Sequence, residues 1–122
     1  MNIFYVFLGG GIGSLLRFGL THLVHKFPKQ IFPVATLGSN LIASFLVGAF
    51  LVLMMKMKPA NAEFFQAFCI VGICGGFSTF STFAKDNLEL MERGYWFIAV
   101  LNILVSVSFC IGMVYLGKKL LG

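Results

Sequence analysis

The sequence predicts an all-α membrane protein whose four transmembrane helices form a single domain, residues 1–122. The chain has 122 residues, of which 59% are hydrophobic and 11% charged, and its mean hydropathy is +0.96. A soluble domain of this size could not bury so much apolar surface, so the surrounding solvent must be lipid. Four apolar stretches each reach the roughly 20 residues that a spanning helix needs. The expected spans cover residues 2–25, 32–55, 62–91 and 95–118.

These spans leave only short connections, so we expect neither a catalytic domain outside the membrane nor an enzyme. The formal charge is +5, and the basic residues other than Arg17 fall in or beside the connections and near residue 118. Cationic side chains at those places meet lipid headgroups, which points to a bilayer rather than to nucleic acid. The three cysteines lie in the spans without a CxxC pair, and we expect them to pack as small apolar side chains.

The first span carries the sequence GGGIGSLLRFG at residues 9–19. Gly9 and Gly13 form a GxxxG pair, which lets another helix backbone approach closely. Three- and four-residue steps also predict one polar face, made by Gly10, Ser14, Arg17 and Thr21. A charge within a span is costly. Arg17 therefore either reaches back to the nearer interface or lines an aqueous vestibule that attracts anions.

The second span repeats small or polar residues at four-residue spacing, namely Thr36, Asn40, Ser44 and Gly48. Asn40 places a carboxamide within an apolar helix. Such a group either joins helices by a hydrogen bond or donates hydrogen bonds to an anion. The fourth span has a similar polar stripe at Asn102, Ser106 and Cys110, for which packing between helices is the alternative.

The third span contains GGFSTFSTF at residues 75–83. The Gly75-Gly76 pair and the hydroxyl residues after it predict a break over residues 75–79, near the middle of the bilayer. Such a break exposes carbonyls that suit sodium, and a new helix start, with Ser78 or Thr79 as caps, that favours anions. The alternative is a glycine kink for close packing, with the hydroxyls bonded to the preceding turn.

Two phenylalanines follow the break, three residues apart and hence on about the same helix face. The positive edges of the Phe80 and Phe83 rings could solvate an anion weakly, as conduction requires. Ordinary packing is the alternative for any aromatic pair at this spacing. The interleaved Ser81 and Thr82 favour the anion path. Beyond them, Lys85, Glu89 and Arg93 can pair along the exposed end of the helix.

Apart from Arg17, which lies within the first span, the basic residues give no preferred orientation in the membrane, since four fall on each side of a four-span topology. One side holds Lys56, Lys58, Lys118 and Lys119, and the other holds Lys26, Lys29, Lys85 and Arg93. A chain that inserts both ways can assemble as an antiparallel pair, which is the unfused form of an inverted repeat.

With these motifs together, the whole chain resembles the Fluc (CrcB) family of fluoride channels. The resemblance rests on GGGIGSLLRF at 9–18, GSNLIASFLVG at 38–48 and GGFSTFSTF at 75–83. It implies a multi-pass protein of the prokaryotic inner membrane, which forms an antiparallel dual-topology homodimer with two fluoride pores between the subunits. It also implies a central structural sodium ion, held by the backbone carbonyls of Gly75 and Ser78 from each subunit.

The resemblance assigns further roles by position. Phe80 and Phe83 match the pore-lining phenylalanines, Asn40 the pore asparagine and Arg17 the vestibule arginine. The remaining pore positions are Ser81, Thr82, Thr36, Asn102 and Ser106. The chain departs from the family pattern in two places. Lys85 and Asp86 follow Ala84 where Ser-x-Glu is usual after the second phenylalanine, and Cys110 stands where the polar track often has a hydroxyl.

Two other functions fit four short spans. A small multidrug-type antiporter needs a carboxylate within the membrane, whereas every acid here lies at an expected span end or in a connection. A non-conducting assembly subunit would use its polar stripes only to join helices. Ion flux through the purified protein distinguishes these possibilities from a channel.

Overall fold

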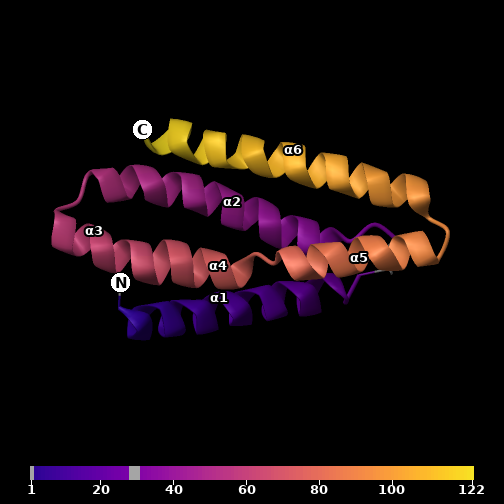
Figure 1. Cartoon of the computed structure of the whole chain (residues 1–122), viewed down its shortest axis with the longest axis horizontal. Helices are drawn as coiled ribbons and strands as arrows, with labels where there is room; N and C mark the ends of the chain where they lie inside the picture. Colours follow the sequence, from indigo (N-terminus) through magenta and orange to yellow (C-terminus); the bar gives the residue numbers. More distant parts are fainter. Residues whose placement is uncertain (1, 28–30) are drawn as a thin grey trace.

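The computed structural model describes residues 2–27 and 31–122, and within these ranges its regular structure is entirely helical. Four antiparallel helical runs lie along one long axis, with both chain ends at the same end of the molecule (Figure 1). All four are long and apolar enough to cross a membrane. The four expected spans are therefore present, and Lys29, which was counted in the comparison of basic residues, lies outside the described residues.

The first, second and fourth runs are single helices: α1 (Ile3–Val24), α2 (Val34–Met55) and α6 (Trp96–Leu121). The third run, Pro59–Glu92, has four parts. It begins with α3 (Pro59–Phe65) and continues as a π-helix, η1 (Gln66–Cys74). It then passes through α4 (Gly75–Phe77) to α5 (Phe80–Glu92). Only residues 78 and 79 of this run are not helical.

The break is shorter than the expected range of residues 75–79. It lies at residues 78 and 79, and the two glycines are helical. Gly75 and Gly76 lie inside α4, and Gly75 has helical torsions of φ −64° and ψ −37°. Gly76 instead allows a close approach, because a side chain there would meet the carbonyl of Gly10 on α1. The extended residues are Ser78 and Thr79. Their hydrogen bonds, described in the next subsection, explain why the helix breaks there.

Glycines bring the helices together in two pairs. α1 packs on η1 and α4, and α2 packs on α6. A side chain added at Gly13 would meet the carbonyl of Ile73, and one at Gly9 would meet that of Phe68, which confirms the expected close approach at the GxxxG pair. Gly48 contacts the backbone of α6 in the same way, at Val114.

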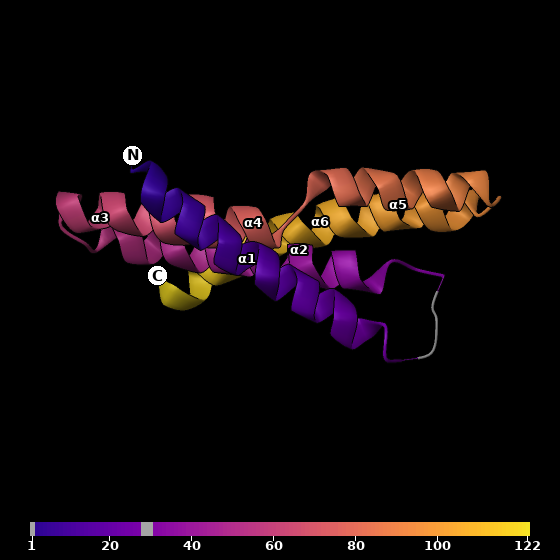
Figure 2. The ribbon, with the colours of Figure 1, turned by 90° about the horizontal axis from the view of Figure 1, so that it is seen from below.

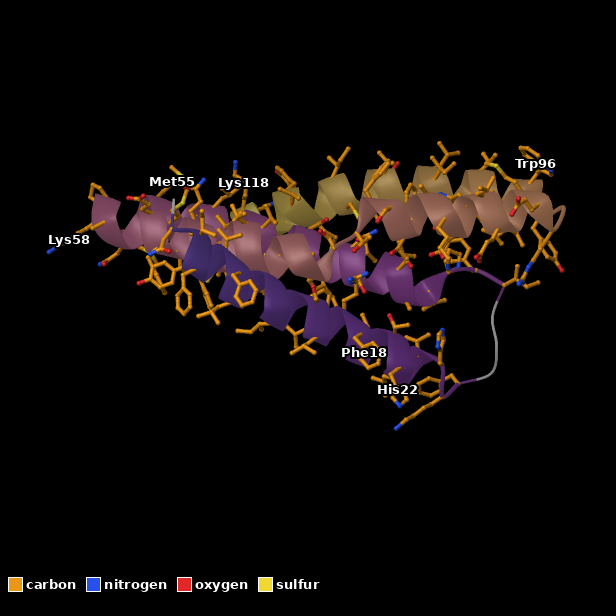
Figure 3. The ribbon with its side chains drawn as sticks, turned by 60° about the horizontal axis from the view of Figure 1, so that its bottom comes forward. Phe18, His22, Met55, Lys58, Trp96 and Lys118 are labelled. Atoms are coloured by element: carbon orange, nitrogen blue, oxygen red, sulfur yellow. The ribbon has the colours of Figure 1, made fainter. Side chains whose placement is uncertain are left out.

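α1 crosses the third run obliquely, so α1 and α5 diverge beyond the break, with the first half of α2 between them (Figure 2). α5 ends at Gly94, whose φ of +86° suits glycine. The Tyr95 N–H donates to the Leu90 carbonyl at 2.8 Å, and this bond closes the turn into α6. Trp96 is exposed at this end, opposite Lys58 and Lys118 (Figure 3).

The glycine contacts predict a position-dependent effect on stability. Gly13→Ala should destabilise the protein by about 1–3 kcal/mol, because the new methyl group would overlap the Ile73 carbonyl. Gly11→Ala is the matched control on the same helix, because nothing lies within 4 Å of its added carbon. It should be neutral or stabilising, since alanine favours helix. Thermal unfolding in detergent measures both, and equal midpoints would contradict the packing described here.

Candidate ion path at the helix break

Residues Ser78 and Thr79 form the break, with φ/ψ of −90°/150° and −146°/118°. Ser78 stays bonded to the preceding turn, because its N–H and its hydroxyl both donate to the Cys74 carbonyl, at 3.1 and 3.0 Å. Thr79 instead leaves the helix: its N–H donates to Oδ1 of Asn40 on α2, at 3.2 Å. A side chain of the neighbouring helix thus satisfies the amide that the break exposes. Thr79 occupies the cap position of α5, yet its side chain makes no capping bond.

This bond fixes which way the Asn40 carboxamide points. An N–H must face an oxygen, so the amide nitrogen of Asn40 lies on the opposite side. No hydrogen bond from this nitrogen is seen among the described residues. Asn40 therefore joins α2 to the third run and also keeps N–H groups for another partner.

The break also leaves a carbonyl without its helical partner. In a continuous helix the Thr79 N–H would bond to the Gly75 carbonyl, but here it bonds to Asn40. Ser78 is extended, so its carbonyl turns away from the direction of the helical ladder. Among the described residues no group of three or more His, Cys, Asp or Glu could hold a metal. A cation held by this part of the chain would thus rely on backbone carbonyls.

A groove of about 240 Å³ borders the break on one side. It is lined by Asn40, Ser44, Ser78, Thr79, Phe80, Phe83, Ser106, Val107 and Cys110. The two phenylalanine rings lie 5.7 Å apart at an angle of 49°. Phe83 is 9% exposed, whereas Phe80 is 80% exposed and projects from the single chain. The groove combines phenylalanine rings, hydroxyl residues and the Asn40 carboxamide, which are the residue types expected around a weakly held anion.

Two further cavities continue from the other side of Asn40 and Thr79. The nearer one is narrow, about 30 Å³, and is lined by Arg17, Thr21, Thr36, Ser39, Asn40, Thr79 and Thr82. Nε of Arg17 is buried and has no hydrogen-bond partner within residues 2–27 and 31–122. The outer cavity, about 550 Å³, shares Thr21, Thr36 and Thr82 with it and opens among His25, Lys85 and Asp86. Together with the groove, these two cavities form the polar track, and Arg17 lines its narrow part.

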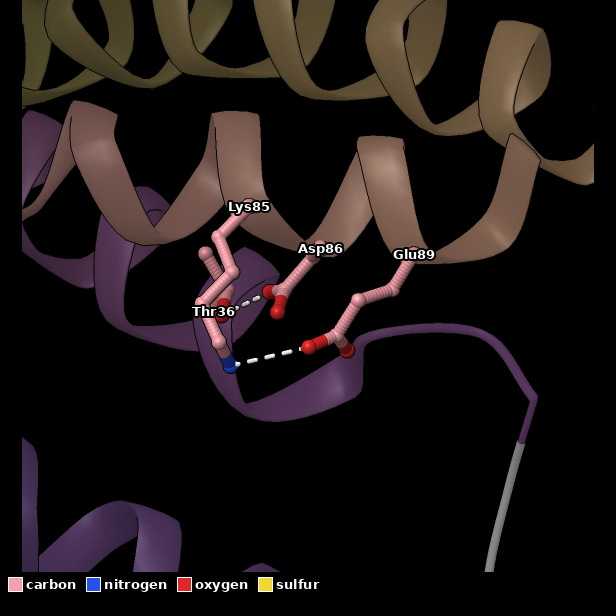
Figure 4. A network of polar contacts seen from close by, with 4 residues as sticks. All are labelled: Thr36, Lys85, Asp86 and Glu89. Carbon is pink, nitrogen blue, oxygen red and sulfur yellow. Dashed lines mark hydrogen bonds and ion pairs between the residues drawn. The ribbon is translucent and has the colours of Figure 1, made fainter. Parts of the chain in front are cut away.

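Charged residues occur at the wide mouth of this track. The Thr36 hydroxyl donates to Oδ2 of Asp86 at 2.6 Å, while Lys85 and Glu89 form an ion pair at 3.3 Å (Figure 4). The ion pair confirms part of the expected pairing along the exposed end of α5. Asp86 stands where the family pattern has a glutamate, and the structure ties this shorter acid to Thr36. Sequence spacing did not reveal this contact, because the two residues are 50 positions apart.

The structure gathers most, but not all, of the residues expected in the pore. Asn40, Phe80, Phe83 and Ser106 line the groove, and Thr36 and Thr82 line the narrower cavity. Ser81 and Gly75 are exposed on the chain surface and line none of these spaces. Asn102 is buried behind Ser106 and borders neither cavity.

Two buried polar residues were missed by the sequence analysis: Ser39 on α2, which lines the narrow cavity, and Asn87. Asn87 on α5 is 5% exposed, and its Oδ1 accepts a hydrogen bond from Nδ2 of Asn102 at 2.8 Å. The available signal was its position four residues after Phe83, on the same face of the helix.

Together, the fold and the polar track define a small multi-pass membrane protein with an interrupted third helical run beside a series of polar cavities. Residues 4–118 match the family described as "CrcB-like protein, Camphor Resistance (CrcB)", and the chain belongs to this family. The family expected from the sequence motifs is thus confirmed.

Curated relatives carry one name, "Fluoride-specific ion channel FluC". The Shewanella pealeana protein is 41% identical over 119 residues, which are 98% of this chain and 94% of the relative. The Ruminiclostridium cellulolyticum protein is 39% identical over 120 residues, 98% and 92% of the two chains. The Coxiella burnetii (strain CbuK_Q154) protein is 34% identical over 117 residues, 96% and 94%. The family is one of ion channels, which confirms that the chain is not an enzyme.

Proposed function

We propose that this chain forms a passive, fluoride-selective channel that exports fluoride from the prokaryotic cytoplasm through the inner membrane and confers fluoride resistance. Family membership supports fluoride as the ion. The observation that carries the proposal is the Thr79–Asn40 bond, which joins a helix break to a carboxamide with free N–H groups beside Phe80 and Phe83.

Physical chemistry explains why a passive path is enough. Hydrogen fluoride is a weak acid that crosses lipid as a neutral molecule, dissociates in the near-neutral cytoplasm and is trapped as fluoride. The membrane potential, negative inside, then drives the ion outward by about 2.3 kcal/mol per 100 mV. No nucleotide or coupled proton is required.

The residues of the track have complementary tasks in this proposal. Arg17 and the Asn40 amide attract and orient the anion at the narrowest point, and the hydroxyl groups replace part of its hydration. The edges of Phe80 and Phe83 then solvate it weakly enough for release. A multidrug antiporter is disfavoured because the narrow part of the track is lined by a cation and hydrogen-bond donors, while Asp86 lies at the wide mouth.

Two chains would form an antiparallel dual-topology homodimer with two pores. Phe80 and Ser81 are exposed in the single chain, so a second copy would complete the surroundings of each pore. A sodium ion at the dimer centre would be held by the carbonyls of Gly75 and Ser78 from each subunit. It would thereby link the two subunits to each other. The Gly75 carbonyl lacks its helical donor and lies on the exposed face of α4, which fits this task.

Fluoride efflux from liposomes tests the proposed function. The wild-type protein should release fluoride, measured with a fluoride electrode after a potassium ionophore is added. Asn40→Asp keeps an oxygen for the Thr79 N–H but adds a negative charge. Efflux should therefore fall about tenfold or more, which corresponds to at least 1.4 kcal/mol in the barrier. Phe80→Ile should also lower it sharply.

Phe97→Ile is the matched control, because Phe97 is 79% exposed, like Phe80, but lies outside the cavities described above. Its efflux should equal that of wild type. Absence of fluoride efflux from the folded wild-type protein would refute the channel and favour a non-conducting assembly subunit.

The dual topology can be tested through charge. In wild type, a carboxy-terminal tag should be accessible to protease on both faces of membrane vesicles, in about equal shares if neither orientation is preferred. Replacing Lys118 and Lys119 together by alanine removes cations from one end, so the opposite end should stay in the cytoplasm and the tag should become largely external. A single orientation in wild type would contradict the antiparallel dimer.

Sodium dependence tests the central ion. Replacing sodium by N-methylglucamine should lower the thermal midpoint of the purified dimer, since a ligand that binds only the folded state stabilises it. Ser78→Ala should keep this dependence, because the proposed ligand is the main-chain carbonyl. Identical midpoints in the two buffers would exclude a stabilising sodium site.

A further inference from the structure

Three buried polar residues form a chain of hydrogen bonds between α5 and α6. Asn87, Asn102 and Ser106 are 5%, 1% and 4% exposed. Nδ2 of Asn102 donates to Oδ1 of Asn87 at 2.8 Å, and the Ser106 hydroxyl donates to Oδ1 of Asn102 at 3.0 Å. Of the three, only Ser106 lines the groove that contains Phe80 and Phe83. The chain therefore connects the groove to a residue that does not touch it.

The direction of these bonds determines what Ser106 presents to the groove. A carboxamide oxygen can only accept, so the Ser106 proton points toward Asn102 and away from the groove. Asn87 fixes this arrangement, because it accepts from the amide nitrogen of Asn102 and so keeps the Asn102 oxygen toward Ser106. Without Asn87, the Asn102 carboxamide could turn over and donate to Ser106, which would free the hydroxyl proton for the groove.

An anion in the groove must consequently compete with Asn102 for the Ser106 proton. Fluoride is small, carries concentrated charge and accepts hydrogen bonds more strongly than an amide oxygen does. Chloride is larger and a much weaker acceptor. We propose that Asn87 is a positioning residue for anion selectivity: through Asn102 it holds the Ser106 hydroxyl away from the groove, so that only a strong acceptor such as fluoride can draw it out. This inference rests on the proposed fluoride conduction.

Selectivity then depends on how strongly fluoride and chloride each accept the Ser106 hydrogen bond, and not on pore width alone. It also keeps fluoride from being held tightly, because each time Ser106 turns to the ion the Asn102 oxygen loses its partner. Fluoride binding is thereby weakened, but chloride binding is weakened more. Removing the Asn87 side chain should leave fluoride conduction largely intact and should allow chloride, the weaker acceptor, to pass as well.

The experiment compares fluoride and chloride efflux from liposomes that contain the full-length protein. Asn87→Leu, similar in size but without an acceptor, should keep fluoride efflux within about threefold of wild type. Its chloride-to-fluoride efflux ratio should rise about tenfold or more, a factor within the cost range of an unsatisfied buried polar group. The smaller Asn87→Ala should show the same change if the leucine variant does not fold. In a Ser106→Ala background, Asn87→Leu should leave the ratio unchanged, because no hydroxyl remains to be released.

Leu90→Ala is the matched control, since Leu90 is buried one turn further along α5 and takes no part in the chain. It should lower the thermal midpoint without changing the ratio. An unchanged ratio in both folded Asn87 variants, or an equal rise in Leu90→Ala, overturns the role of Asn87 while leaving the channel standing. Absence of fluoride efflux in wild type refutes the proposed function instead.

Discussion

The hydrogen bond from the Thr79 N–H to the Asn40 side chain is the interaction on which the rest of the site depends. In hydrocarbon no water can satisfy a backbone group, so a helix can be interrupted only where the protein supplies a partner. Asn40 supplies it from α2. The same bond withdraws the usual donor from the Gly75 carbonyl and turns the Asn40 nitrogen away from Thr79. One contact thus leaves both the Gly75 carbonyl and the Asn40 N–H groups without a hydrogen-bond partner among the described residues.

Close packing of backbones makes this contact possible. Glycines on α1 and in the third run bring these elements into direct contact up to α4, and α2 is held to α6 by Gly48 and Gly117. Beyond the break, α1 and α5 diverge (Figure 2). The polar track opens in this space and widens toward Lys85 and Asp86. The position at which close packing ends therefore determines where the passage begins.

The sequence was sufficient to predict the four spans, the glycine contacts and most residues around the groove. Hydrophobic length and residue spacing are local properties that survive folding. It placed the break over residues 75–79 and began it at the two glycines, because glycine weakens helices in isolation. In the folded chain, however, α1 packs against these residues and keeps them helical, while Thr79 finds an acceptor 39 positions away. The Thr36–Asp86 and Asn87–Asn102 bonds were likewise hidden, since each depends on how two distant helices are rotated about their axes.

The hydrogen-bond donors of the track differ in how free they are to bind an ion. Ser78 and Ser106 on the groove side and Thr36 and Ser39 on the mouth side all donate to acceptors within the protein. By contrast, Nε of Arg17 and the Asn40 nitrogen have no partner among the described residues. An ion would thus meet fixed donors at the narrowest point and exchangeable ones on both sides. Because each exchangeable hydroxyl has an internal acceptor to return to, release costs less than it would from a site of permanently free donors, and conduction requires such easy release.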